Sequence, residues 1–205
     1  MRVLLGCEES GIAREAWRKR GHAAYSNDLL PARDGSEYHL QMDVMLAIKY
    51  RGPWDAIILF PPCTYTCLSG NGTWAGTSER LRGMEFTHNV WSLAKEHCPR
   101  VGLEQPMTMV GRMMGKPTQK VNLWWFGDQE TKETWLWLHG LPLLVADAPT
   151  DIREPRVHYE SPGIKHGLTR SQRRQTLRPG FARAMAEQWG EDEAVQRVVK
   201  GIVNG

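Results

Sequence analysis

The sequence predicts one α/β domain, residues 1–205, built on an open, mostly parallel sheet with helices on both faces. Short continuous apolar runs, typical of strands buried on both faces, alternate with amphipathic helical patterns. The clearest run, 54–60 (WDAIILF), is stopped by Pro61 and Pro62. The length of 205 residues also suits a single domain.

The first half of the chain provides the alternation of strands and helices. We expect strands at 2–6, 23–26, 54–60 and 100–103, and helices at 9–20, 44–50 and 79–96. Another short strand is expected just before Asp43. The Gly/Ser/Thr-rich stretch 68–78 is expected to be a flexible loop.

The second half of the chain is less regular. Residues 107–122 read as a loop, and 123–126 and 134–138 read as two strands that could pair as a hairpin. Residues 141–177 form a short, irregular and basic segment. Two helices are expected at the end, at 179–189 and 191–203.

Composition narrows the class of protein. The content of 41% hydrophobic and 24% charged residues is that of a soluble globular domain, and a net charge of +3 excludes a histone-like polycation. No run approaches the roughly 20 apolar residues of a membrane helix. The first apolar run is too short for a signal peptide, so we expect a cytoplasmic protein without a membrane partner. Four scattered cysteines and unspaced histidines predict neither a disulfide framework nor a metal site.

Polar residues cluster where predicted strands end, which is where open α/β sheets bind ligands. A loop between Gly6 and Gly11 opens the first helix, and Asp28 follows about 20 residues later, where a ribose is commonly held. Asp43 ends another strand. A plain strand–helix turn and two helix-capping aspartates would fit the same pattern.

Two further residues follow central strands. Cys63 lies just after Pro61 and Pro62, and Glu104 closes the next strand. A thiolate beside a carboxylic acid suits attack on an electron-poor ring whose nitrogen the acid hydrogen-bonds. Cys63 as a small buried apolar residue, and Glu104 in a structural ion pair, are the alternative interpretations.

These residues resemble, in order and setting, the motifs of the cytosine-5 DNA methyltransferases. Residues 6–11 are similar to the Phe-x-Gly-x-Gly loop, 26–28 to Ser-Asn-Glu, and 55–70 to the strand with its Pro-Cys-Gln loop. Residues 104–106 match the place of the family's Glu-Asn-Val motif, and residues 126–134 resemble its Gln-x-Arg-x-Arg segment. The chain from 2 to 190, including the last motif at 179–189, looks like small phage and prophage proteins of that family.

The resemblance implies a Rossmann-like methyltransferase fold that uses S-adenosylmethionine and acts on a flipped cytosine in DNA. The implied catalytic residues are Cys63, Glu104 and Lys132. The implied cofactor-binding residues are Gly6, Cys7, Glu8, Gly11, Asp28, Asp43 and Pro61. The implied substrate or DNA residues are Pro62, Thr64, Ser69, Trp74, Arg170, Arg173 and Arg174.

The chain departs from the family pattern around the base. Thr64 replaces the glutamine after the nucleophile, and Gln105 and Pro106 replace asparagine and valine. Lys132 and Thr134 replace the two arginines, and lysine lacks the bidentate geometry of a guanidinium.

Basic and aromatic residues add candidates for nucleic-acid contact. Six basic residues and no acidic ones lie between 165 and 183, a pattern that tracks phosphates or forms a solvated surface. Arg80, Arg82, Arg112, Lys116 and Lys120 could extend it. Trp74 could stack on a base. Four tryptophans on periodic apolar faces are expected in the core: Trp17, Trp54, Trp91 and Trp189.

Three functions stay open at this point. The first is methylation of cytosine in DNA, and the second is the same chemistry on a free pyrimidine nucleotide or a modified base. The third is a non-catalytic nucleic-acid-binding relic of the fold. The stretch 141–177 is too short for the target-recognition domain of the family. The protein would therefore either bind DNA with low sequence selectivity or depend on a homodimer or a partner to recognise a sequence.

Overall fold

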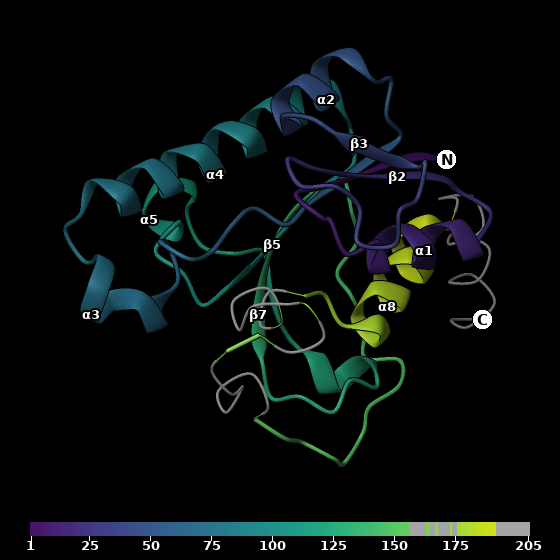
Figure 1. The fold of residues 1–205 in the computed structure, drawn as a ribbon. Helices are drawn as coiled ribbons and strands as arrows, with labels where there is room; N and C mark the ends of the chain where they lie inside the picture. Colours follow the sequence, from purple (N-terminus) through teal and green to yellow (C-terminus); the bar gives the residue numbers. More distant parts are fainter. Residues whose placement is uncertain (156–162, 165–166, 168–172, 174–175, 192–205) are drawn as a thin grey trace.

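A computed structural model describes residues 1–155, 163–164, 167, 173 and 176–191 (Figure 1). Its strands are β1 Arg2–Gly6, β2 Ala23–Asp28, β3 His39–Gln41, β4 Ala56–Leu59, β5 Val101–Pro106, β6 Gln119–Asn122 and β7 Glu133–His139. They form one sheet in the order β3-β2-β1-β4-β5-β7-β6. The first five are parallel neighbours, and β7 runs antiparallel to both β5 and β6. This mixed, mostly parallel sheet is compatible with a Rossmann-like fold.

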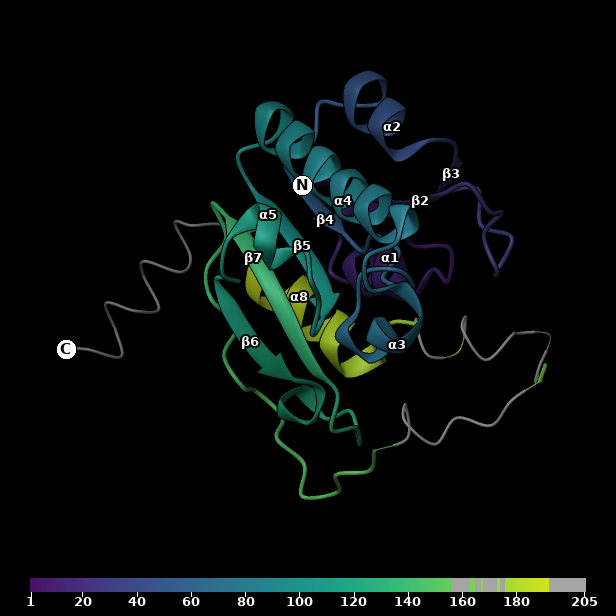
Figure 2. The ribbon, with the colours of Figure 1, turned by 90° about the vertical axis from the view of Figure 1, so that its left-hand side faces the viewer.

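Helices cover both faces of the sheet, as predicted. They are α1 Ile12–Lys19, α2 Val44–Tyr50, α3 Asn71–Trp74, α4 Ser78–His97, α5 Gly111–Met114 and α8 Pro179–Gly190, with 3-10 turns η1 Leu68–Gly70 and η2 Leu123–Phe126. Figures 1 and 2 show α1 beside α8 on one face and α2 beside α4 on the other. The helix α3 projects from the end of α4 (Figure 2).

Successive side chains of the buried strands point to opposite faces of the sheet and pack into two hydrophobic cores. In β1, Val3 and Leu5 pack with α1 and α8, whereas Leu4 packs with α2 and α4. The four tryptophans expected in the core are buried there: Trp17, Trp54, Trp91 and Trp189. Burying such large apolar side chains on both faces stabilises the sheet and fixes its register.

Several predicted elements agree closely with the structure. The helix predicted at 44–50 has those bounds, and the one predicted at 79–96 is one residue longer at each end. The helix predicted from residue 9 begins only at Ile12. Gly11 precedes it with φ of 80°, a left-handed conformation that cannot continue a right-handed helix.

The predictions for the second half need correction. Residues 123–126 form the 3-10 turn η2 and not a strand, and the hairpin partner of β7 is β6, which lies in the predicted loop 107–122. Only Val121 of β6 is buried, so the strand lacks the apolar alternation that would reveal it. The stretch 68–78, expected to be a flexible loop, contains η1 and α3.

The remaining predictions concern parts with less regular structure. Within 141–155 no helix or strand is present apart from a single bridge between Glu130 and Glu154, in agreement with the predicted irregular segment. The helix expected at 191–203 lies outside the described residues. None of the described helices is long and apolar enough to span a membrane.

Candidate functional site

The sheet changes direction of winding between β1 and β4. The chain leaves β1 toward β2 on one side and leaves β4 toward β5 on the other. The loops beyond such a switch point diverge and leave a crevice for ligands. A cavity of about 220 Å³ lies there, lined by 7–10 after β1, by Asp28, Leu30 and Arg33 after β2, and by 60–63 after β4.

The wall of this cavity is completed from distant parts of the chain. Glu104 and Pro106 of β5 line it, together with Lys132 before β7 and residues 176–177 before α8. The structure thus brings the predicted residues Cys7, Glu8, Asp28, Pro61, Pro62, Cys63, Glu104 and Lys132 to one cavity. The cavity is thus lined by residues from both groups predicted from the sequence: the loop between Gly6 and Gly11, and the thiol with its acid.

The loop after β1 turns sharply. Cys7 has φ of 60°, and Glu8 donates its backbone N–H to the Asn27 carbonyl at 2.8 Å, which ties the loop to β2. Burial raises the pKa of the Cys7 thiol, and the carboxylates of Asp28 and Asp43 add to this rise. Gly6 and Gly11 do not line the cavity. A Cβ on Gly6 would meet Leu59 and Val44.

Glu8 is a buried carboxyl group in this loop. Its side chain is 5% exposed, and Ser10 donates a hydrogen bond to its Oε1. Its Oε2 is buried and has no hydrogen-bond partner among the described residues. Burial raises the pKa of Glu8. A buried carboxylate oxygen without a hydrogen-bond donor is costly.

Arg33, which the sequence analysis did not single out, lies at the same end of the cavity. Its guanidinium donates to Glu9 through Nη2 and to Thr176 Oγ1 through Nη1 at 2.8 Å. Its Nε is buried and has no partner among the described residues. Asp28 also lines the cavity, and its Oδ1 accepts the backbone N–H of Leu30 at 3.0 Å.

Asp43 does not line this cavity. Its side chain caps α2, because Oδ1 accepts the backbone N–H groups of Met45 at 2.8 Å and Leu46 at 3.2 Å. The contacts of Asp43 are therefore those of a helix cap, which was the alternative interpretation of this aspartate.

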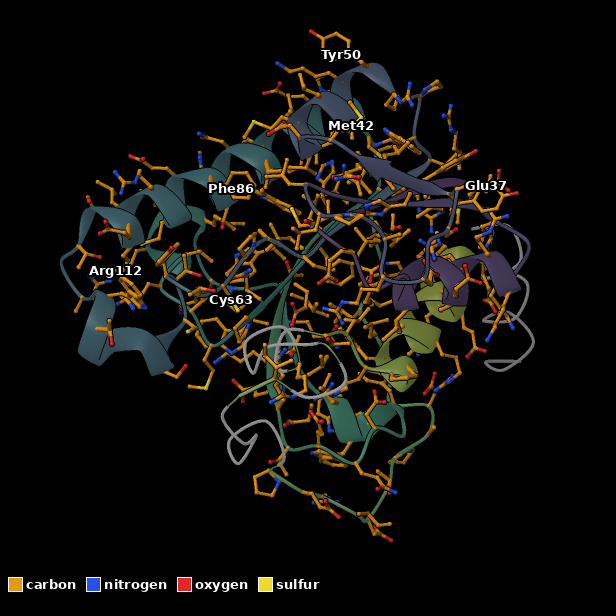
Figure 3. All side chains as sticks on the ribbon, viewed as in Figure 1. Glu37, Met42, Tyr50, Cys63, Phe86 and Arg112 are labelled. Carbon is orange, nitrogen blue, oxygen red and sulfur yellow. The ribbon has the colours of Figure 1, made fainter. Side chains whose placement is uncertain are left out.

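Cys63 lies just beyond β4 and is labelled near the middle of Figure 3. Burial raises the pKa of its thiol to about 11; the Lys132 ammonium opposes this rise, and Glu104 and Cys67 add to it. A thiol with that pKa is ionised in roughly one molecule in ten thousand at pH 7. The resting thiol is therefore protonated, and a nucleophilic step must remove its proton as the new bond forms.

Glu104 is held in place by two donors from the segment that leads into β7. Lys132 Nζ lies 3.5 Å from Glu104 Oε1, and Thr134 Oγ1 donates to the same oxygen at 3.2 Å. The antiparallel pairing of β5 with β7 places Thr134 beside this strand end. Glu104 is thus ion-paired with a lysine and hydrogen-bonded by a threonine, without a guanidinium.

Gln105 is a positioning residue whose role the sequence analysis missed. Its buried side chain donates through Nε2 to the Pro61 carbonyl and accepts the Thr66 hydroxyl at 3.1 Å. Cys63 also accepts, through its carbonyl, the backbone N–H of Cys67 at 3.0 Å. These bonds fix both ends of the turn that carries the thiol. The position of Gln105 directly after Glu104 was the only available signal.

The expected substrate residues after Cys63 lie outside the cavity. Thr64 and Ser69 are exposed, and Trp74 is half-buried with its ring edge-on to Tyr65 at 4.8 Å between centroids. Arg80, a candidate phosphate contact, is instead buried and donates to the carbonyls of Tyr65 and Cys67. Its charge organises the loop after the thiol.

The basic segment is also engaged internally where it is described. Arg178 donates to Glu130 at 2.7 Å, and Arg183 pairs with Asp147 at 2.7 Å. Arg173 donates to the Gly163 carbonyl at 3.2 Å, whereas Arg170 and Arg174 lie outside the described residues. Arg112, within α5, is exposed at the outer edge of the molecule (Figure 3).

The last predicted motif, residues 179–189, packs against the segment that precedes β7. Asp128 accepts the backbone N–H groups of Gly180 at 2.9 Å and Phe181 at 2.7 Å, and so caps α8. A Cβ on Gly180 would collide with the Phe126 carbonyl. This cap places Thr176 and Leu177 over the cavity.

No protein-family model matches the chain, and no curated protein matches it at a significant level.

Proposed function

We propose that this protein transfers a methyl group from S-adenosylmethionine to carbon 5 of cytosine in DNA through a covalent bond to Cys63. One observation carries the proposal. Cys63 and Glu104 line the same cavity as the loop after β1 and Asp28. A nucleophile, an acid and a nucleoside-binding edge are then close enough for one reaction.

A separate observation supports the assignment of the cofactor to this cavity. The unpartnered Glu8 Oε2 calls for a cationic or hydrogen-bond-donating ligand. Asp28 and Pro61 line the cavity, and the Asp28 carboxylate would accept the ribose hydroxyl groups. When bound, S-adenosylmethionine supplies an electrophilic methyl group.

The chain's own residues perform the remaining steps. Cys63 forms a bond between sulfur and carbon 6 of the ring as its proton passes to water, assisted by the nearby Lys132 cation. Glu104 in its acid form, oriented by Lys132 and Thr134, donates a hydrogen bond to ring nitrogen 3, accepts one from the amino group and stabilises the developing charge. After carbon 5 gains the methyl group, water takes the carbon-5 proton and the carbon–sulfur bond breaks, which returns the thiolate.

Mass spectrometry of nucleosides from host DNA tests this function. Expression of the wild-type chain should produce 5-methylcytosine, and expression of Cys63→Ala should not. Equal 5-methylcytosine in both strains, or none in either, would contradict the proposal.

A second candidate keeps the chemistry but uses a free pyrimidine nucleotide. It is favoured by the internal engagement of Arg80, Arg178 and Arg183, which leaves fewer of the described cations for phosphates of a duplex. Purified protein incubated with the cofactor and either dCMP or duplex DNA separates the two candidates. Product on dCMP alone would establish the second.

A further inference from the structure

The sheet face that packs against α4 is only partly covered over its last two strands. Trp137 of β7 points to this face, where it is buried next to α5 and donates its indole N–H to the Gly115 carbonyl at 3.2 Å. Trp135, two residues earlier in the strand, points to the same face but is only half-buried. Figure 2 shows α5, β6 and β7 together on the side that faces the viewer. A solvent-exposed surface therefore extends from α5 across β6 to Trp135.

This surface, which we call the α5–β6 face, consists of Arg112, Lys116, Lys120 and Trp135. Its three cations are exposed, and none of them forms a salt bridge with another described residue. The chain has no acidic residue between 104 and 128. The surface therefore presents a local concentration of positive charge, which suits an anionic partner.

Lys120 is held in place before any partner binds. Its ammonium lies 4.5 Å from the centroid of the Trp135 ring, on the residue that it faces across the pairing of β6 with β7. Trp135 is oriented in turn by Glu133, whose Oε1 accepts the indole N–H at 2.7 Å. A cation fixed over a ring loses less side-chain freedom on binding an anion than a freely rotating lysine does.

The sheet places this cation close to the strand that ends beside the thiol. Trp135 pairs with Lys120 on one side and with Gln105 of β5 on the other. Gln105 donates to the Pro61 carbonyl in the turn that carries Cys63. Lys120 and Gln105 are two strand spacings apart, roughly 10 Å. That distance corresponds to about three base pairs of a DNA duplex.

We infer that the α5–β6 face binds the phosphate backbone of the DNA that flanks the target cytosine, through Arg112, Lys116 and Lys120. The inference rests on the proposed function, because the reaction at Cys63 identifies the polyanion as DNA. Several separate cations without carboxylate partners match a row of phosphates better than a single small anion. The basic segment 165–183 matches less well, because two of its arginines are paired with carboxylates.

Binding of DNA in the absence of methyl transfer tests this surface. A short fluorescein-labelled duplex is titrated with protein at several salt concentrations, and fluorescence anisotropy gives the affinity. The test variant combines Arg112→Gln, Lys116→Gln and Lys120→Gln. A matched control removes the same charge from exposed cations on and beside α1 and α2, by Lys19→Gln, Lys49→Gln and Arg51→Gln. Thermal unfolding checks that both variants are folded.

The two variants should differ clearly. The test variant should bind the duplex about 10- to 100-fold more weakly at low salt. The slope of log affinity against log salt concentration should fall by about 2 to 3, since each lost phosphate contact removes about 0.9. The control variant should change the affinity by less than about threefold. In the methylation assay the test variant should raise KM for DNA and leave kcat within about threefold, because its substituted residues do not line the cavity.

The contradictory results are distinct from a failure of the proposed function. If the test variant binds DNA as the wild type does, or both variants lose affinity equally, the α5–β6 face is wrong even where the wild type methylates DNA. If the wild type methylates no DNA but the test variant alone loses binding, the reaction is overturned and the phosphate contact stands. If an oligoglutamate peptide binds the wild type more tightly than the duplex does, and loses affinity in the test variant, the surface serves an acidic protein and the inference is overturned.

Discussion

The two ends of the cavity differ in how completely their buried polar atoms are hydrogen-bonded. At the thiol end, Glu104 is paired with Lys132 and hydrogen-bonded by Thr134. At the loop end, Glu8 and Arg33 each retain a buried atom without a partner among the described residues. A fully hydrogen-bonded set keeps its geometry before a substrate arrives, which suits chemistry, whereas a buried polar atom without a partner gains most when a hydrogen-bond partner reaches it.

The pH dependence of Cys63 reactivity sharpens this comparison most strongly. Because the pKa of the thiol is raised to about 11, its alkylation by iodoacetamide should accelerate about tenfold per pH unit from pH 7 to about 10. Peptide mass spectrometry measures the rate at Cys63. Glu104→Gln removes a charge that raises the pKa and should move the midpoint down, and Lys132→Met should move it up. A midpoint near pH 8 in the wild type would contradict the described burial.

Removal of the acid should affect catalysis and spare the loop end. Glu104→Gln should lower the methylation rate by about 10²- to 10⁴-fold, since the acid stabilises charge on the ring. Binding of S-adenosylhomocysteine should change by less than about threefold. Glu85→Gln, on an exposed position of α4, is the control. Equal losses in cofactor affinity would show that the two ends are not independent.

Asp28 provides the matching test at the loop end. Asp28→Asn should weaken S-adenosylhomocysteine and 5′-methylthioadenosine alike, by about 10- to 100-fold, because both ligands carry the ribose. Titration calorimetry measures both affinities, with exposed Asp151→Asn as control. Unchanged affinities would remove Asp28 from the cofactor site.

The cap on α8 joins the two ends, so its loss should reduce stability with a smaller effect. Asp128→Ala leaves the N–H groups of Gly180 and Phe181 without their acceptor. The free energy of unfolding should fall by about 1–2 kcal/mol, as for other lost helix caps. Urea denaturation measures it, with Asp151→Ala as the comparison. A change below about 0.3 kcal/mol would show that the cap contributes little.

The residues at the thiol end of the cavity were easier to predict from the sequence than those at the loop end. Strand ends were predictable from continuous apolar runs and stopping prolines, and parallel pairing then places Cys63 and Glu104 on one edge. Glu8 was predicted at the cofactor site through its place in the loop. The burial of its Oε2 without a hydrogen-bond partner among the described residues is a tertiary property that no local pattern encodes. Arg33 lies in a polar loop without any motif.

Other incorrect predictions concern residues whose local sequence pattern fits two different structural roles equally well. The Trp pair in 123–126 looks like strand material, but the chain turns there and leaves through Gly127 at φ of 91°. Asp43 has the same spacing as a ligand and as a helix cap, and its contacts are those of the cap. Arg80 looks like a phosphate contact until its three loop partners are known.

The most direct test of the central claim uses DNA that contains 5-fluorocytosine, because fluorine on carbon 5 cannot leave as a proton does. Wild-type protein with S-adenosylmethionine should form a covalent complex that survives denaturing electrophoresis, and peptide mapping should place the bond at Cys63. Cys63→Ser should form none, and Cys67→Ser should still form it. A wild-type protein that binds the DNA and the cofactor without forming this adduct would contradict the account.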